Sequence, residues 1–217
     1  MTKKMKKIII AFAAAMMALV ACNQTANVNP TETNMEGNRK VLLVVDLQKD
    51  FIDGTLQAAN GREIVPVVDS IKNSFDRICF TLDWHPSNHC SFTDFGGIWP
   101  VHCVQYTAGA SLPDCILTGV SSDKYDVVLK GRDQAAEEYG AFAAEGSVAE
   151  VFHNGDEVVV CGIAAEYCVL ETLKNIMKEA ENLNLKVSVC LDAVAYITEY
   201  TPLVEYMKEN NIPAYEL

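Results

Sequence analysis

The chain is short of positive charge. Its 217 residues include 17 lysines and arginines against 29 aspartates and glutamates, which gives a formal net charge of −12. Lysines gather only at the start, at Lys3, Lys4, Lys6 and Lys7, and no basic stripe follows. Because such a surface repels phosphate backbones, we exclude nucleic-acid binding as a function class.

The sequence also lacks an apolar run long enough to cross a bilayer comfortably. The uncharged segment 8–20 is shorter than the roughly 20 residues that a spanning helix needs, and it follows the basic residues. This order is typical of a secretory signal. Leu19-Val20-Ala21-Cys22 resembles a bacterial lipobox, although an ordinary signal peptide with an incidental cysteine is the alternative. We therefore expect a signal peptide over residues 1–21, lipidation of Cys22, and a flexible Asn- and Thr-rich tether over 22–39.

That interpretation predicts an exported bacterial lipoprotein, anchored in a membrane on its periplasmic or cell-surface side and touching it only through the lipid. Eight cysteines in an exported chain raise the question of disulfides. Without Cys22 seven remain, an odd number, which indicates at least one free thiol. Three of the seven lie in apolar, strand-like runs, where cysteine is commonly a small buried residue. Three others lie in predicted loops, where a disulfide remains open.

Hydrophobic residues make up 50% of the chain, enough for a sizeable core. Apolar runs rich in Val, Leu and Ile alternate with segments of helical spacing, and continuous runs are typical of parallel strands buried on both faces. The pattern predicts one α/β domain over residues 40–217, a three-layer α/β/α fold around an open, mostly parallel, six-stranded Rossmann-like sheet. We expect strands at 40–46, 77–83, 125–130, 157–161, 186–191 and 214–217, and helices at 64–75, 147–153, 167–183 and 202–210.

Reactive side chains stand at the ends of four predicted strands. Asp46 follows the first strand and Asp83 ends the second. Lys130 ends the third, and Cys168 follows the fourth at the start of a helix. Each has a structural alternative: a capping or salt-bridged carboxylate, a solvated lysine, a buried helix cysteine. Because ligands bind at the carboxyl ends of strands in open α/β sheets, the coincidence favours a shared active site.

Cys168 is the candidate nucleophile. A thiolate attacks where a thiol does not, and a helix N-terminus lowers the pKa of a cysteine by favouring negative charge. We therefore expect a lowered pKa for Cys168, in the first turn after Gly162. Asp46 would take the thiol proton and later return it to a leaving amine, and Lys130 would stabilise the ionised pair.

Histidines before and within the long loop 84–124 suggest a metal site. Asp83 and His85 share a face of an extended chain because they are two residues apart. With His102 they form a set of two imidazoles and one carboxylate, suited to Zn, Fe(II) or Mn with water completing the shell. His89 is a further candidate ligand, whereas His153 fits a surface position better.

Five motifs in order resemble the nicotinamidases and pyrazinamidases of the isochorismatase-like cysteine hydrolase superfamily, and the resemblance covers essentially all of residues 40–217. The motifs are VVDLQKDF (44–51), DWHPSNH (83–89), WPVHC (99–103), KGRD (130–133) and CGIAAEYCV (161–169). The resemblance implies hydrolysis of nicotinamide to nicotinate and ammonia, a step of NAD salvage, through a cysteine thioester. Asp46, Lys130 and Cys168 would be the catalytic residues.

The same resemblance implies a divalent metal, most commonly zinc and otherwise iron or manganese, that anchors the pyridine nitrogen. Asp83, His85 and His102 would be its ligands. His89 matches a position that is a ligand in some relatives and a neighbour of the ligands in others. The oligomeric state is not implied.

Binding of the substrate ring is also implied. Phe51 and Trp99 would enclose the ring, with Tyr139 nearby. The backbone N–H groups of Ala164 and Cys168 would hold the oxyanion, helped by a cis peptide bond before Ala164.

Two departures and two rival functions remain. Ala165-Glu166 stands where the family commonly has an Ala or Thr followed by Asp, and residues 54–58 lack a common double glycine. Export is unusual for a salvage enzyme. The rivals are a hydrolase of carbamoyl or other amides from the same superfamily, and an exported protein that binds nicotinamide or metal without turnover. The metal motif argues against the first rival, and the Asp–Lys–Cys set argues against the second.

Overall fold

The computed structural model describes residues 38–217. The predicted signal peptide, the lipidation site at Cys22 and nearly all of the predicted tether lie outside these residues. Within the described part, no helix combines the length and the apolar character that crossing a bilayer requires.

Five parallel strands form one sheet in the order β3-β2-β1-β4-β5. β1 is the central strand, and its sequence suits this position, because the residues after Lys40 are all valine or leucine and all of them are buried. Gly162, near the end of β4, has a φ of +121°, and a Cβ there would clash with the backbone of Val45 in β1. Only glycine therefore allows the two strands to end side by side. The strands are β1 (Lys40–Val45), β2 (Arg77–Asp83), β3 (Tyr125–Lys130), β4 (Glu157–Ile163) and β5 (Lys186–Ala195).

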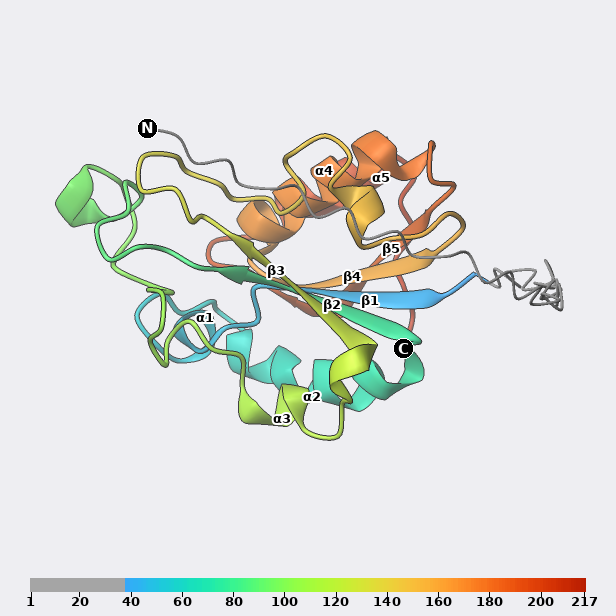
Figure 1. Cartoon of the computed structure of the whole chain (residues 1–217), viewed down its shortest axis with the longest axis horizontal. Helices are drawn as coiled ribbons and strands as arrows, with labels where there is room; N and C mark the ends of the chain where they lie inside the picture. Colours follow the sequence, from blue (N-terminus) through green and yellow to red (C-terminus); the bar gives the residue numbers. More distant parts are fainter. Residues whose placement is uncertain (1–37) are drawn as a thin grey trace, which may run out of the picture. The chain divides into compact units, whose positions relative to one another are not determined.

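Helices cover both faces of the sheet, as the strand pattern predicts (Figure 1). Alternate residues of β1 divide between two cores. Leu42 and Val44 pack on the side of α2, and Leu43 and Val45 on the side of α4. The helices are α1 (Lys49–Ile52), α2 (Gly61–Ile71), α3 (Asp114–Leu117), α4 (Leu170–Ala180) and α5 (Thr201–Glu209); a π-helical turn spans Ala165–Val169, and short 3-10 turns lie at Lys72–Ser74, Thr93–Phe95, Ser122–Lys124 and Val148–Glu150.

The predicted sixth strand is wrong in extent. Ala214 makes only a single parallel bridge with Val189, and the residues after Tyr215 are exposed at the end of the chain. Pro213 contributes only its carbonyl, which accepts from Val189, because proline has no N–H to extend the ladder. The described sheet thus has five strands.

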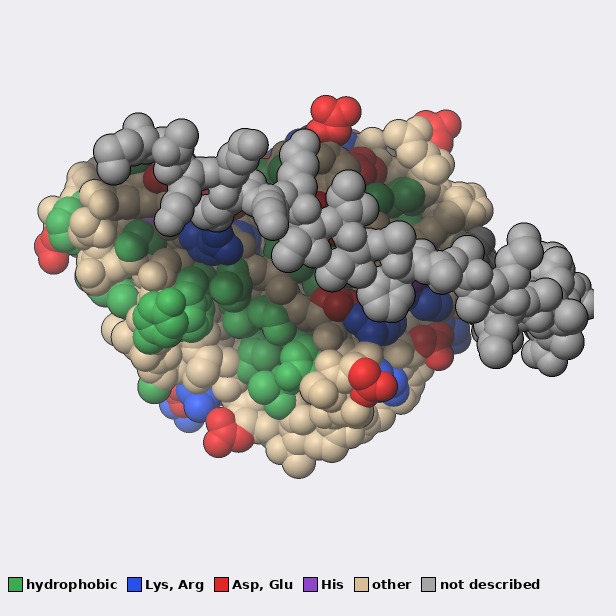
Figure 2. Space-filling view, viewed as in Figure 1, with side chains coloured by type: hydrophobic (Ala, Val, Ile, Leu, Met, Phe, Trp, Pro, Cys, Tyr) green, Lys and Arg blue, Asp and Glu red, His purple; other side chains and the backbone are tan. Residues whose placement is uncertain are grey.

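Two further predictions need correction. β3 is one of the two edge strands of the sheet and is not buried on both faces, since Val127 and Leu129 are 45% and 37% exposed. Figure 2 shows apolar side chains gathered on the face that presents β3. The helix expected at 147–153 is a single 3-10 turn, because Val148 and Phe152 turn into the core while Gly146 before it and Gly155 after it adopt positive φ.

Candidate active site

Lys130 ends β3 at the carboxyl edge of the sheet, and its ammonium contacts two carboxylates. Its Nζ lies 2.8 Å from Oδ2 of Asp46 and 2.5 Å from Oδ1 of Asp83. All three side chains are buried. Strand register explains the meeting: Asp83 pairs with Lys130 across β2 and β3, and Asp46 follows β1 with a φ of +46° that turns the chain at the edge. These three residues therefore meet at one edge of the sheet, as the prediction from strand ends expects.

Cys168 joins this group from a π-helical turn before α4. Nζ of Lys130 donates to its Sγ at 3.5 Å. One carboxylate oxygen each of Asp46 and Asp83 and the Cys168 Sγ all lie within 4.8 Å of one another. The Ile163–Ala164 peptide bond before the turn is cis, in line with the resemblance.

Burial and neighbouring charges together set the direction in which the pKa of each of the four groups shifts. Burial raises the pKa of the Cys168 thiol well above its ordinary value; Lys130 opposes this shift, and the Asp46 and Asp83 carboxylates add to it. It also raises the pKa of Asp46, despite the opposing Lys130 ammonium. For Asp83, Lys130 and His85 outweigh burial and hold the pKa below its usual range. For Lys130, the two carboxylates outweigh burial and raise the pKa.

The lowered pKa expected for Cys168 is therefore wrong for the free site. The helix-terminus argument counts only the favourable dipole, whereas the thiol is buried beside two carboxylates. Its position also differs from the prediction, because Cys168 belongs to the π-helical turn and α4 begins at Leu170. A base is consequently required to ionise the thiol.

Asp83, His85 and His102 gather their donor atoms within 4.8 Å of one another. Nε2 of His85 lies 3.5 Å from Oδ2 of Asp83, and Nε2 of His102 lies 3.9 Å from the same oxygen. All three side chains are buried. Hydrogen bonding to Asp83 raises the pKa of His85 against the effect of burial, whereas burial lowers the pKa of His102.

Backbone carbonyls orient both imidazoles. Nδ1 of His85 is 2.9 Å from the Gly131 carbonyl oxygen, and Nδ1 of His102 is 2.8 Å from that of Pro100. Since a carbonyl only accepts, each Nδ1 carries a proton. In the neutral ring each Nε2 therefore carries the lone pair, and protonation of the His85 Nε2 turns its 3.5 Å contact with Asp83 into an ion pair. Gly131, with a φ of +63°, is needed here because a Cβ would clash with the His85 ring.

His89 lies outside this donor set. Its Nδ1 is 2.7 Å from Oγ of Ser91, and its Nε2 is 3.1 Å from the Ala136 carbonyl oxygen. The ring lies against that of His85, with 4.1 Å between centroids. His89 therefore packs behind His85 with both nitrogens engaged.

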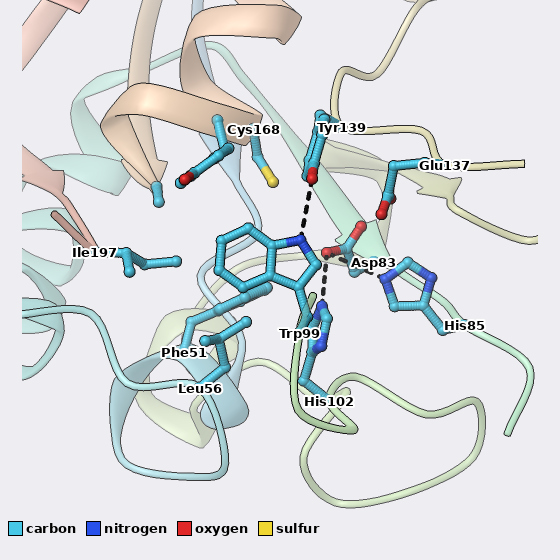
Figure 3. Close-up of a pocket in the computed structure, with 12 residues that line it drawn as sticks. Phe51, Leu56, Asp83, His85, Trp99, His102, Glu137, Tyr139, Cys168 and Ile197 are labelled. Atoms are coloured by element: carbon cyan, nitrogen blue, oxygen red, sulfur yellow. Dashed lines mark hydrogen bonds and ion pairs between the residues drawn. The ribbon is translucent and has the colours of Figure 1, made fainter. Parts of the chain in front are cut away.

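A pocket opens beside these groups (Figure 3). Its atom-free volume is about 330 Å³, mouth included. Its lining combines aromatic and apolar side chains with a few polar groups, as sites for small molecules commonly do. Of the residues predicted to bind substrate, Phe51, Trp99, Tyr139 and Ala164 all line it. The rest of the lining is Leu56, Asp83, His85, His102, Glu137, Tyr167, Cys168 and Ile197.

Trp99 lies in the middle of the lining residues that Figure 3 draws. Its Nε1 donates to the Tyr139 hydroxyl at 3.0 Å, and its ring meets Tyr167 edge-on with 5.0 Å between centroids. The ring centroids of Phe51 and His102 are 5.4 Å apart. Loop 84–124 thus contributes an aromatic wall fixed to the opposite side of the pocket.

Sequence reasoning missed several supporting residues, Gln48 above all. Its buried amide donates to the Asp83 carbonyl at 2.8 Å and accepts from the Asp83 N–H at 2.8 Å. Thr81 donates to Oδ1 of Asp46 at 2.7 Å. The position of Gln48 directly after Asp46-Leu47, at the end of a predicted strand, was the signal in the sequence that could have pointed to it. The question of a disulfide between loop cysteines is settled for the described residues: all of their cysteines, including Cys115, are free.

Comparison with known proteins agrees with this geometry. The Isochorismatase domain profile matches residues 40–210. The nicotinamidase of Saccharomyces cerevisiae is 32% identical over 207 residues, covering 78% of this chain and 94% of the yeast protein.

Two solved structures are similar throughout. The pyrazinamidase of Pyrococcus horikoshii in complex with zinc has 32% identity and a TM-score of 0.71, covering 82% of this chain and 99% of its own. The L. infantum protein in complex with nicotinate has 29% identity and a TM-score of 0.70, covering 82% of this chain and 93% of its own. The chain therefore belongs to the isochorismatase family and, within it, to the nicotinamidases and pyrazinamidases.

Proposed function

We propose that this chain hydrolyses nicotinamide to nicotinate and ammonia, and that it accepts related aromatic amides such as pyrazinamide. The observation that carries the proposal is the contact of one buried ammonium, Lys130, with Asp46, Asp83 and Cys168 at the floor of a small aromatic pocket. The reaction would recover a pyridine-nucleotide precursor for NAD salvage.

Asp46 is the base for the first step. The raised pKa of the Cys168 thiol keeps it protonated at rest, and the raised pKa of Asp46 makes that carboxylate a stronger base than an exposed one. Asp46 takes the thiol proton as the sulfur attacks the carboxamide carbon. Lys130 offsets the charge that moves from the carboxylate to the sulfur, because it contacts both.

Collapse of the tetrahedral adduct completes the first half-reaction. Asp46 passes its proton to the amide nitrogen, the carbon–nitrogen bond breaks, and ammonia leaves a thioester on Cys168. A water molecule then attacks the thioester while Asp46 takes its proton. Returning that proton to the departing thiolate restores the resting site and frees nicotinic acid, which loses its remaining proton to the solvent as nicotinate.

The oxyanion is assigned to the backbone N–H groups of Ala164 and Cys168. Both Ala164 and Cys168 line the pocket, which supports this assignment. Phe51 and Trp99 would contact the pyridine ring, and the Tyr139–Trp99 hydrogen bond would hold the Trp99 side of that contact.

A divalent metal, zinc above the alternatives iron and manganese, fits Asp83, His85 and His102. The donors are buried, two are imidazoles with free Nε2 atoms, and together they match a three-ligand site with open positions. Charge supports the same choice: the two buried carboxylates exceed the one ammonium, so a cation would offset the surplus. When bound, the metal would anchor the pyridine nitrogen directly or through water. His89 would support His85 rather than serve as a ligand.

The location remains a proposal built on sequence. The lipobox-like segment supports export and anchoring through Cys22. Incorporation of a labelled fatty acid into the wild type, and its loss in Cys22→Ser, would support this location. Equal labelling of both forms, or of neither, would refute it.

Ammonia release from nicotinamide by the purified chain tests the activity. Release abolished by a chelator and restored by zinc is the expected result. Release that survives chelation would remove the metal from the proposal. No release from folded, reduced, zinc-supplied chain would refute nicotinamide hydrolysis, and a screen of carbamoyl amides together with nicotinamide binding would then separate the two rival functions.

A further inference from the structure

Glu166 reaches away from the reacting groups, although it stands two residues before Cys168. Its half-buried carboxylate accepts hydrogen bonds from three consecutive backbone N–H groups on the segment that follows β5. Ile197 donates to Oε1 at 3.1 Å and to Oε2 at 3.3 Å. Thr198 and Glu199 donate to Oε1 as well, the latter at 3.3 Å.

Successive backbone N–H groups that converge on one acceptor form an anion-binding concavity. Here the anion is a side chain of the same protein. Segment 197–199 lies between β5 and α5, so neither a strand ladder nor a helix satisfies these donors. Among the hydrogen bonds of the described residues, Glu166 is the acceptor that these three N–H groups have.

We call these hydrogen bonds between Glu166 and segment 197–199 the clamp. Ile197 connects the clamp to the pocket. Its side chain lines the pocket, and Figure 3 shows it on the wall that Phe51 and Leu56 share. On the preceding side the backbone is tied to a different element: the Tyr196 carbonyl accepts from Ala59 at 2.7 Å. The position of Ile197 is thus fixed from the Leu56–Ala59 loop before it and from Glu166 at and after it.

We propose that Glu166 is a positioning residue that sets the width of the pocket, by anchoring segment 197–199 to the turn that carries Cys168. The inference rests on the proposed function for its substrate class: a single-ring pyridine carboxamide packed against Ile197. A loosened clamp would let Ile197 withdraw. The pocket would then hold nicotinamide less tightly and discriminate less against ring-substituted nicotinamides.

Kinetics of the full chain with zinc test the pocket role. Glu166→Ala removes every acceptor, and we expect KM for nicotinamide to rise on the order of tenfold with little change in kcat. The kcat/KM ratio of 5-methylnicotinamide to nicotinamide should rise. Glu166→Gln keeps one acceptor oxygen and should restore most of the wild-type KM. Glu199→Ala is the matched control, since it removes an exposed carboxylate from the same segment, and it should match the wild type.

Amide hydrogen exchange of residues 197–199 tests the clamp without any reference to activity. Faster exchange in Glu166→Ala than in Glu199→Ala is expected, and equal exchange would overturn the clamp. Faster exchange with unchanged KM and unchanged discrimination would overturn the pocket role, as would a loss confined to kcat. A wild type without turnover would refute the proposed function instead. The dissociation constant of nicotinate in the same variants would then replace KM.

Discussion

In the reactive half of the site, formed by Asp46, Lys130 and Cys168, charged side chains hold one another. In the histidine half, formed by Asp83, His85 and His102, the backbone holds the side chains: carbonyls fix both imidazoles, and Gln48 fixes the backbone of Asp83. The first arrangement depends on charge balance and the second on preorganised geometry. The ion pair between Lys130 and Asp83 joins the two halves.

Loss of the nucleophile should separate the two halves most sharply. Cys168→Ala removes only a buried sulfur, so the fold and the zinc affinity should stay near those of the wild type. Ammonia release from nicotinamide should fall at least about 10⁴-fold. Cys190→Ala, also buried but in β5, is the matched control for burial. Residual activity near one part in ten would assign attack to another group.

Loss of the shared ammonium should damage both halves. Lys130→Met leaves Asp46 and Asp83 facing each other in a buried space, so we expect about 3–5 kcal/mol less stability. Activity should drop about 10³-fold, because the anionic adduct loses its counter-charge. Chemical denaturation and ammonia release measure the two effects.

Lys49→Met provides the contrast for this variant. Lys49 pairs with Asp114 at 3.1 Å, but that carboxylate is 95% exposed, so stability should change by less than about 1 kcal/mol. Equal destabilisation by the two variants would contradict the role given to burial.

Removal of an imidazole should act on the histidine half alone. His102→Ala should weaken zinc binding at least about 100-fold and raise KM, while the pKa directions in the reactive half persist. Calorimetric titration of zinc into metal-free chain measures the affinity. Exposed His153→Ala should bind zinc like the wild type. If both variants bind alike, the metal site lies elsewhere.

Acidification should produce the smallest effect and distinguish the two imidazoles. Asp83 raises the pKa of His85 above its ordinary 6.5, so His85 takes up a proton already as the pH falls through that raised value. Zinc binds only the neutral ring, and affinity should therefore fall by up to about tenfold per pH unit once the pH is below that raised pKa. His102, whose pKa is lowered, should not contribute until the pH is below 6.5. Zinc affinity that stays level down to about pH 6 would contradict this order.

The sequence was sufficient to predict the site's membership because parallel strands end at one edge. Asp46, Asp83 and Lys130 each stand at such an end, and two residues of spacing were enough to add His85. Hydropathy could not tell an edge strand from a central one, so β3 was predicted to be buried on both faces. The predicted sixth strand at 214–217 is only a single bridge at Ala214, because Pro213 before it has no N–H to extend the ladder.

What sequence could not supply depends on tertiary contacts. Burial raises the pKa of Cys168, and two carboxylates that come from other strands add to this shift. The hydrogen bonds that Gln48 makes with Asp83 and Glu166 with Ile197 join residues 35 and 31 positions apart in the chain, so local patterns do not reveal them. The position of His89, with both nitrogens occupied, likewise depends on Ala136 from a distant loop.

Asp83 divides its two carboxylate oxygens between neighbours: Oδ1 meets Lys130, and Oδ2 faces the two imidazoles. A cation held here would receive one oxygen from this carboxylate. Calcium binds about six to eight oxygens and commonly binds both oxygens of one carboxylate. Zinc commonly has about four ligands and binds imidazole nitrogen. The lysine that balances the reacting groups therefore also makes this site a poor one for calcium.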